Sequence, residues 1–168
     1  MSSSTCDMSS SLMFPSKDEL KGAVQGTLLY LSLYFFFFIP FQSLSKFYIL
    51  KQKRAEARAN SKGADDKQEE ISLSSVKYYN SQDSLALKGD RTTGNFIEFA
   101  ILFIPLLWIH AIFVDAAQSF NISVIYTLSR AIYPFVFGKR GLILCSTLPG
   151  YMIYFYLIYE IASKFAFA

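Results

Sequence analysis

The sequence is poor in the residues that build disulfide frameworks and metal sites. Its 168 residues include two cysteines and one histidine. Cys6 and Cys145 make no disulfide framework and lack zinc-site spacing, and a single histidine excludes a multi-histidine metal site within one chain. Charged residues make up 17%, against roughly 25% in an average soluble domain, which excludes disorder over most of the length. The small net charge of +3 gives no reason to expect a nucleic-acid partner.

Apolar residues are abundant and unevenly spread. They make up 52% of the chain, and the aromatics include 17 Phe and 11 Tyr. Phe35 to Phe38 is an unbroken run, and Asn95 to Val114 contains one acid and no Lys or Arg. A soluble fold of this size has too small a core to bury several apolar segments of about 20 residues. The sequence therefore predicts an all-α integral membrane protein.

Four membrane spans follow from the apolar segments. We expect them at about residues 21–50, 93–114, 117–138 and 142–163, each long enough for a hydrocarbon core of about 30 Å. Pro40 should kink the first span. The connections between the last three spans are very short, which forces neighbouring helices to be antiparallel. The prediction is a four-helix up-and-down transmembrane bundle.

The polar segments set the domain organisation and the orientation. Residues 1–20 are expected to be a flexible N-terminal segment, and residues 21–168 a membrane domain with a cytosolic loop at 51–92. This loop holds nine Lys and Arg and the 139–141 connection holds two, whereas the opposite side holds three. The excess of positive charge places the loop and the connection in the cytosol, with both termini across the membrane.

Two charged residues, Glu98 and Arg130, lie well inside predicted spans. Their depths from the cytosolic side are roughly 10 Å and roughly 12 Å at 1.5 Å per residue. A lone charge at such a depth is costly and usually has a partner inside the protein. We therefore expect Glu98 and Arg130 to pair, within one chain or across a subunit boundary. Lys46 lies near a span end, where its ammonium group can reach water.

The two charges belong to polar faces of two spans. Arg91, Asn95 and Glu98 follow an i, i+4, i+7 pattern, and Arg130 and Tyr133 share a face of the third span. This stripe suits a small, charged, peptide-like ligand, because guanidinium groups bind carboxylates bidentately and a carboxylate can hold an ammonium group. The alternative is a buried ion pair that fixes helix register, with Arg91 reaching to the interface.

The same residues resemble a known family. The segment from Arg91 to Glu98 reads Arg-Thr-Thr-Gly-Asn-Phe-Ile-Glu. It resembles the R-x-x-G-N-x-x-E signature of the MAPEG family, the membrane-associated proteins of eicosanoid and glutathione metabolism. In that family an apolar stretch with a proline follows, as it does here. Arg130-Ala-Ile-Tyr133 is similar to the R-x-x-Y of the family's third helix, and the order, spacing and four-span topology agree over roughly residues 20–165.

The resemblance implies a homotrimer that binds glutathione, its co-substrate, in a cleft between adjacent subunits, open to the cytosol. By position it assigns glutathione binding to Arg91, Asn95, Glu98 and Tyr133, with Arg130 supporting the site. The implied partners are membrane lipids and a lipophilic small-molecule substrate. We expect an integral, multi-pass protein of the endoplasmic reticulum or another endomembrane.

The residue that would activate glutathione departs from the family pattern. In active members an Arg near the start of the fourth helix stabilises the thiolate, because a nearby cation lowers the pKa of a thiol from about 8.5. Residues 141–151 contain no Arg. Arg140 is the nearest basic candidate, with Ser146 and Thr147 as alternative hydrogen-bond donors, and Arg140 and Tyr133 are the catalytic candidates.

Two functions remain open from the sequence. The first is a membrane-bound glutathione transferase or peroxidase that conjugates or reduces lipophilic electrophiles. The second is a non-catalytic lipid-binding or scaffold protein of the same family, which the missing fourth-helix Arg favours. A channel or transporter is a weaker reading, because four short spans offer no pair of broken helices. His110 and Cys145 are expected to pack rather than to react.

Overall fold

The computed structural model describes residues 14–60, 71–72, 76, 82–139 and 141–166. Within these residues the fold is entirely helical, without a β-strand. The elements are α1 (Lys17–Leu33), a π-helical turn η1 (Tyr34–Phe38), α2 (Ile39–Asn60), α3 (Ser84–Phe113), α4 (Ser119–Val136) and α5 (Ile143–Ala166). The all-α prediction is confirmed for this part of the chain.

The first helix begins with a capping box. The Ser16 hydroxyl accepts a hydrogen bond from the Glu19 N–H at 3.3 Å, and the Glu19 carboxylate accepts one from the Ser16 N–H at 2.6 Å. These bonds satisfy two backbone donors near the helix start. Residues 17–20 are therefore helical rather than part of a flexible segment, while residues 1–13 lie outside the described residues.

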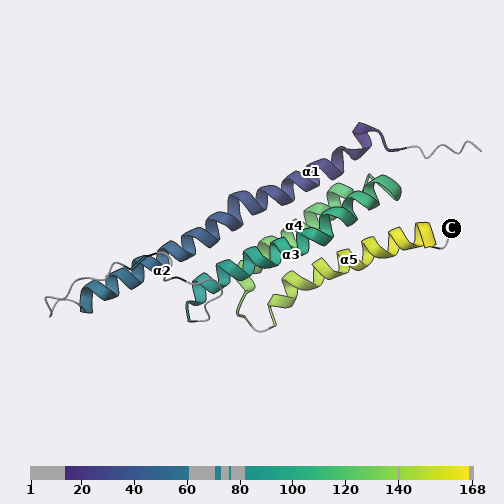
Figure 1. The fold of residues 1–168 in the computed structure, drawn as a ribbon. Coiled ribbons are helices and arrows are strands. Elements are labelled where there is room, and N and C mark those ends of the chain that lie inside the picture. The colour runs from purple at the N-terminus through teal and green to yellow at the C-terminus, as the bar shows by residue number, and fades with distance from the viewer. Residues whose placement is uncertain (1–13, 61–70, 73–75, 77–81, 140, 167–168) are drawn as a thin grey trace, which may run out of the picture.

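The first helix continues through a π turn into α2, so that α1, η1 and α2 form one rod (Figure 1). Proline has no N–H, and its ring clashes with the carbonyl four residues earlier, which for Pro40 is that of Phe36. The turn η1 lies directly before Pro40, and the Ile39 N–H donates to the Tyr34 carbonyl, five residues back. The disturbance expected at Pro40 thus takes the form of a π turn, a recognised cause of helix irregularity.

The helical rods lie side by side and alternate in direction along the chain (Figure 1). α1 packs on α4, α2 packs on α3, and α5 packs on both α3 and α4. Glycines permit the close approach of two of these pairs. A Cβ at Gly26 would overlap the Ser123 Oγ, and a Cβ at Gly89 would lie 2.6 Å from the Ser45 Oγ. A larger residue at Gly26 would separate α1 from α4, and one at Gly89 would separate α2 from α3.

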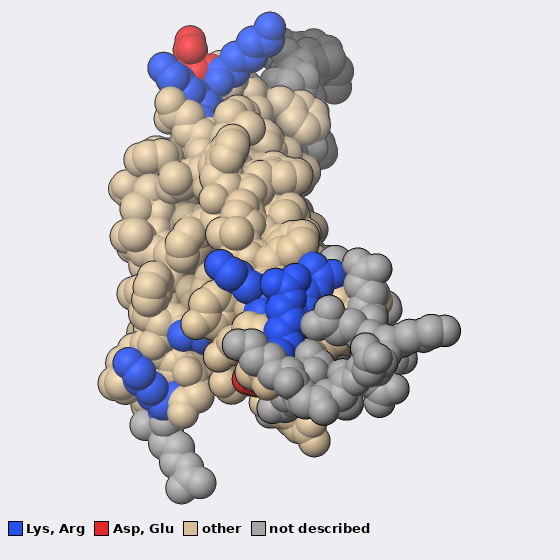
Figure 2. Space-filling view, turned by 90° about the vertical axis from the view of Figure 1, so that its left-hand side faces the viewer, with Lys and Arg blue, Asp and Glu red and all other residues tan. Residues whose placement is uncertain are grey.

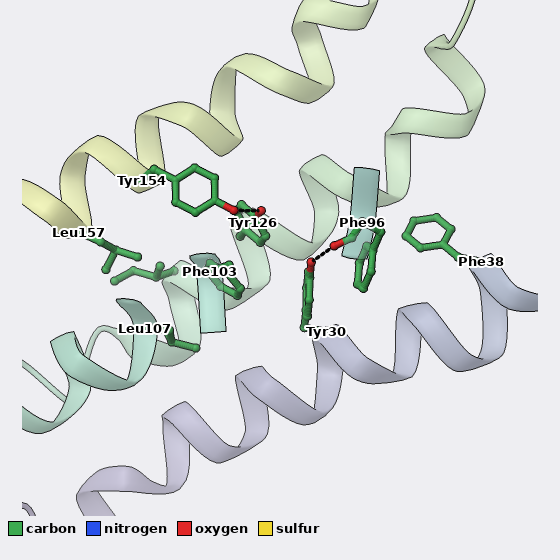
Figure 3. Packing of buried hydrophobic residues seen from close by; sticks show 9 residues of the cluster. Tyr30, Phe38, Phe96, Phe103, Leu107, Tyr126, Tyr154 and Leu157 are labelled. Carbon is green, nitrogen blue, oxygen red and sulfur yellow. Dashed lines mark hydrogen bonds between the residues drawn. The ribbon is translucent and has the colours of Figure 1, made fainter. Parts of the chain in front are cut away.

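Aromatic residues form the core between the rods (Figure 3). Phe103 stacks on Tyr126 with ring centroids 3.8 Å apart, and Tyr30 stacks on Phe96 at 4.1 Å. The buried tyrosine hydroxyls are also paired. Tyr30 donates to the Phe96 carbonyl at 3.0 Å. Tyr126 donates to the Tyr154 hydroxyl at 2.5 Å, which in turn donates to a backbone carbonyl of α3 at 2.8 Å. These bonds allow tyrosine to be buried where phenylalanine would otherwise be expected.

A buried ion pair joins α2 to α3. The Lys46 Nζ lies 3.0 Å from the Asp90 Oδ1, and the two side chains are only 9% and 1% exposed. The Gln42 Nε2 donates to the same carboxylate oxygen at 2.7 Å. Lys46 was expected to reach water, and this expectation is wrong. Its ammonium group instead faces the Asp90 carboxylate, which the close contact at Gly89 brings next to α2.

Two rods are long and apolar enough to cross a membrane. They are Lys17–Ala59, with a mean hydropathy of 1.6 in its most apolar window, and Ser84–Phe113, with a value of 2.2. Both are longer than the spans predicted from the sequence. α2 continues to residue 60 and α3 begins at Ser84, so helix occupies both ends of the polar segment 51–92. A helix can continue beyond the bilayer, because its backbone hydrogen bonds are internal.

The Lys46–Asp90 pair gives a stability prediction. Lys46→Met removes the ammonium group that faces the buried Asp90 carboxylate and should destabilise the fold by about 3–5 kcal/mol. The double variant Lys46→Met with Asp90→Leu should recover much of this loss, because no charge then remains unpaired. The thermal unfolding midpoint of the detergent-purified protein measures both effects.

The Lys53–Asp83 pair provides a matched control between the same two helices. Its atoms lie 2.9 Å apart, but its side chains are 33% and 14% exposed. Lys53→Met should cost about 1 kcal/mol or less, since water screens an accessible pair. Equal losses at Lys46 and Lys53 would contradict a special role for burial.

Candidate functional site

The first predicted polar face, made of Arg91, Asn95 and Glu98, lies on α3, as its spacing requires. Arg91 and Glu98 are exposed and Asn95 is half-buried. The residues between them turn the other way: Thr92 and Phe96 are buried. The stripe is therefore an accessible polar edge of a helix whose opposite face packs in the core. It can meet a ligand or a neighbouring subunit without any change in the helix.

Tyr133 of α4 brings the second polar face, made of Arg130 and Tyr133, next to the polar face of α3. Its side chain is 5% exposed. It lies within electrostatic range of Arg91, Glu98 and Arg130. Asn95 also lies near the Tyr133 side chain. The structure thus brings five of the six candidate site residues into one cluster around Tyr133, while Arg140 lies outside the described residues.

Arg130 is the most deeply buried cation of this cluster, at 3% exposure. Its Nη2 donates to the Ser146 carbonyl of α5 at 2.9 Å. Its guanidinium carbon lies 5.0 Å from the centre of the Phe99 ring and 5.3 Å from that of Tyr126. Such cation–π contacts stabilise a desolvated guanidinium. Gly150 leaves the space that the guanidinium fills, because a Cβ there would overlap Nη2.

The expected ion pair between Glu98 and Arg130 is absent within the described part of the chain. Arg130 points toward α5 and its Nε and Nη1 have no hydrogen-bond partner. Glu98 lies on the exposed edge of α3. A buried guanidinium with two unused donors and no carboxylate beside it is unusual, since buried charges are normally paired. The site therefore has a surplus of positive charge that an anion can neutralise.

The hydroxyl groups proposed as thiolate donors are already engaged. The Ser146 Oγ donates to the Ser129 carbonyl at 2.6 Å, and the Thr147 Oγ1 donates to the Ile143 carbonyl at 3.0 Å. A hydroxyl has one hydrogen to donate, so neither can also donate to a sulfur atom in this arrangement. Cys145, which directly precedes Ser146 in sequence, is exposed and forms no disulfide.

His110 lies outside this cluster. It is fully buried near the other end of α3, and neither ring nitrogen has a hydrogen-bond partner. Its nearest recorded aromatic neighbour is Tyr156, at 6.0 Å between ring centres. Twelve residues separate it from Glu98, about 18 Å along a helix. Its burial agrees with the prediction of a packed histidine rather than a base for this site.

Sequence reasoning missed the residues that hold Arg130. Gly150 and Phe99 shape its pocket, and Ser146 accepts its hydrogen bond through the backbone rather than offering its side chain. A glycine inside an apolar helix was the available signal, because such a residue often marks a close approach. The partner of a backbone carbonyl has no signature in the sequence.

No protein-family model, no curated protein and no solved structure matches this chain. A function for this chain therefore has to be inferred from the chemistry of the described residues and from the short motif between Arg91 and Glu98.

Gly150→Ala tests the placement of Arg130. The new methyl group displaces the guanidinium and breaks its hydrogen bond to the Ser146 carbonyl. Loss of a hydrogen bond to a charged group costs about 1.5–3 kcal/mol, so the thermal unfolding midpoint should fall clearly. Gly22→Ala is the matched control, because its Cβ would meet the Phe120 Cβ at 3.4 Å, an ordinary contact. If the two alanines behave alike, Gly150 does not reserve space for Arg130.

Proposed function

We propose that the chain is a multi-pass membrane protein in which all four helical rods cross the bilayer as an up-and-down bundle. Two rods support this directly by length and hydropathy. Large apolar side chains are exposed on every rod, among them Leu28, Ile101, Leu128 and Phe155. Figure 2 shows Lys and Arg at the two ends of one face, with a broad uncharged belt between them. Such a belt is what a hydrocarbon core requires.

The proposed orientation can be checked by thiol labelling. In a chain with Cys6→Ser and Cys145→Ser, a cysteine at Ser72 should react with an impermeant reagent from the cytosolic side, because the basic 51–92 segment stays in the cytosol. A cysteine at Ser16 should react only from the opposite side. Protection of Ser72→Cys together with cytosolic labelling of Ser16→Cys would reverse the topology.

Within that membrane we propose a glutathione site at the cytosolic ends of α3 and α4. The observation that carries the proposal is the guanidinium of Arg130, which is buried with two nitrogens that lack a hydrogen-bond partner and with no carboxylate of the described residues beside it. Glutathione offers two carboxylates, an ammonium group and a thiol. Arg91 and Arg130 suit its anionic groups, Glu98 suits its ammonium group, and Asn95 can pair with a peptide bond.

The supported reaction is transfer of glutathione to a lipophilic electrophile. The thiol loses its proton, the thiolate sulfur bonds to the electrophilic carbon, and the leaving group departs with its electron pair. The cluster contributes position and charge rather than covalent chemistry. We assign thiolate stabilisation to Arg140, since the hydroxyl groups of Ser146 and Thr147 are engaged elsewhere. Tyr133 contacts the bound peptide from α4. Reduction of lipophilic hydroperoxides by the same thiolate is the related peroxidase activity.

We further propose that the working form is a homotrimer, in an endomembrane such as the endoplasmic reticulum. Arg91 and Glu98 are exposed on a helix edge, so a site built from one chain alone would be open on that side. A neighbouring copy would close it and supply further contacts to the ligand. Exposed apolar residues on the same helix, such as Ile97 and Ile101, would then be covered by protein instead of lipid.

One observation favours the second function, a non-catalytic lipid-binding or scaffold protein. Neither hydroxyl in the first turns of α5 has a hydrogen to give to a sulfur. Without a contribution from Arg140, the thiol would remain protonated at neutral pH, because its ordinary pKa is about 8.5. The cluster would then bind its ligand without activating it.

Two substitutions separate binding from activation. Arg91→Gln should weaken glutathione affinity by about 1.5–3 kcal/mol, or roughly 10-fold to 150-fold, the range for a charged hydrogen bond. It should leave the pKa of the bound thiol unchanged. Arg140→Leu should bind nearly normally but raise that pKa, which appears as lost thiolate absorbance at neutral pH.

Lys164→Gln is the control for a lost positive charge, because this exposed lysine lies at the far end of α5. Calorimetric titration of the purified protein gives the affinities. Absence of saturable glutathione binding in the unsubstituted protein would reject the site. Saturable binding with an unshifted thiol pKa, unaffected by Arg140→Leu, would select the non-catalytic function.

A further inference from the structure

A groove runs along one face of α2, beside the start of α3. It has a volume of about 460 Å³, within the usual range for small-molecule sites. Its lining comes almost entirely from α2, with one residue from the start of α3: Phe41, Leu44, Ser45, Phe47, Tyr48, Lys51 and Leu85. Positions 41, 44, 48 and 51 recur at intervals of three or four, so they share one face of the helix.

The opposite face of α2 is firmly attached to α3. It carries Gln42 and Lys46, which bind the Asp90 carboxylate, and two turns later Lys53, which pairs with Asp83. These contacts fix the rotation of α2 about its axis. The groove face is therefore held outward by the ion pairs behind it, and its apolar side chains stay accessible: Leu44, Phe47 and Tyr48 are all more than half exposed.

The chemistry of the groove changes in a definite order along the helix. Phe41 and Leu44 come first, Phe47 and Tyr48 follow, and the exposed Lys51 ends the groove. In membrane proteins, apolar residues lie in the hydrocarbon core, tyrosines are enriched at the interface, and lysines lie near the lipid phosphates. A lipid that lies along the groove would place its acyl chain against the apolar side chains and its phosphate beside Lys51.

The depth of these residues agrees with that order. The first span predicted from the sequence covers residues 21–50, so Phe41 and Leu44 lie in its last third. Lys51 directly follows the span, at the interface where the lipid phosphates are.

We propose that this groove binds one anionic phospholipid, with an acyl chain against Phe41, Leu44 and Leu85 and the phosphate beside Lys51. The proposal rests on the membrane location proposed above and is independent of the glutathione site. A lipid is favoured over a second copy of the chain by charge complementarity, because the groove is apolar along its length and ends in a single cation. One phosphate with one acyl chain has that same distribution.

Native mass spectrometry of the full-length, detergent-purified protein tests this proposal. The probes are phosphatidylserine and phosphatidylcholine with identical acyl chains, added in equal amounts. The unsubstituted protein should retain phosphatidylserine preferentially. Lys51→Gln should lower the ratio of bound phosphatidylserine to bound phosphatidylcholine about fivefold, the factor that corresponds to about 1 kcal/mol for one lysine near an anionic surface. Lys164→Gln, which removes an exposed lysine elsewhere, should leave the ratio unchanged.

A second pair of variants tests the acyl contact separately. Leu44→Asn should reduce retention of both lipids and leave their ratio intact, because it weakens the apolar part of the groove alone. Leu28→Asn is the control, since Leu28 has a similar exposure on the same rod but lies outside the groove. Inorganic phosphate at millimolar concentration should not displace bound phosphatidylserine, which distinguishes a lipid headgroup from a free phosphate.

Several results would overturn the groove assignment. These are equal retention of the two lipids, an unchanged ratio in Lys51→Gln, equal effects of Lys51→Gln and Lys164→Gln, or displacement by inorganic phosphate. Disulfide formation between two copies carrying Leu44→Cys, with no lipid retained, would assign the groove to a second copy. Recovery of the chain in the soluble fraction without detergent would instead reject the membrane location. Glutathione binding bears on neither result.

Discussion

A polar group buried between apolar helices has to find its partner inside the protein, and this requirement accounts for the main contacts of the fold. The tyrosine hydroxyls of the core donate to one another and to backbone carbonyls of α3. Lys46 faces Asp90, and Ser146 bridges to the Ser129 carbonyl. Each contact joins two different rods. Helix packing here is therefore specified by hydrogen bonds and one ion pair as much as by apolar area.

At the candidate site this requirement is only partly met, as it also is at the buried His110. Arg130 has one hydrogen bond and two aromatic faces, but two of its nitrogens remain without partners. The groups that shape its pocket come from three helices, which explains why the guanidinium keeps one position. A site of this kind combines a rigid scaffold with an unmet charge, and its ligand then contributes to the stability of the bundle as well as occupying it.

The apolar runs predicted the helices, because long segments with few charges favour a structure whose backbone hydrogen bonds are all internal. They did not predict polar partners. A lysine that follows an apolar segment predicts contact with water, and no pattern in the sequence singles out Asp90 beside Arg91. Glu98 and Arg130 were paired because their depths agree, but depth says nothing about direction around a helix axis. Arg130 points to α5 because Gly150 leaves room there, and that complementarity exists only once two helices are packed.

The π turn before Pro40 also sets how far α2 is rotated about its axis relative to α1. An i→i+5 turn accommodates one residue more than an α-helical turn does, and each residue advances an α-helix by about 100°. Every side chain after Phe38 is therefore rotated by roughly that amount relative to an uninterrupted helix. With a uniform pitch, Lys46 would not face Asp90 and the groove face of α2 would not point outward. The π turn at Tyr34–Phe38 thus allows the first half of the rod to pack on α4 while the second half packs on α3.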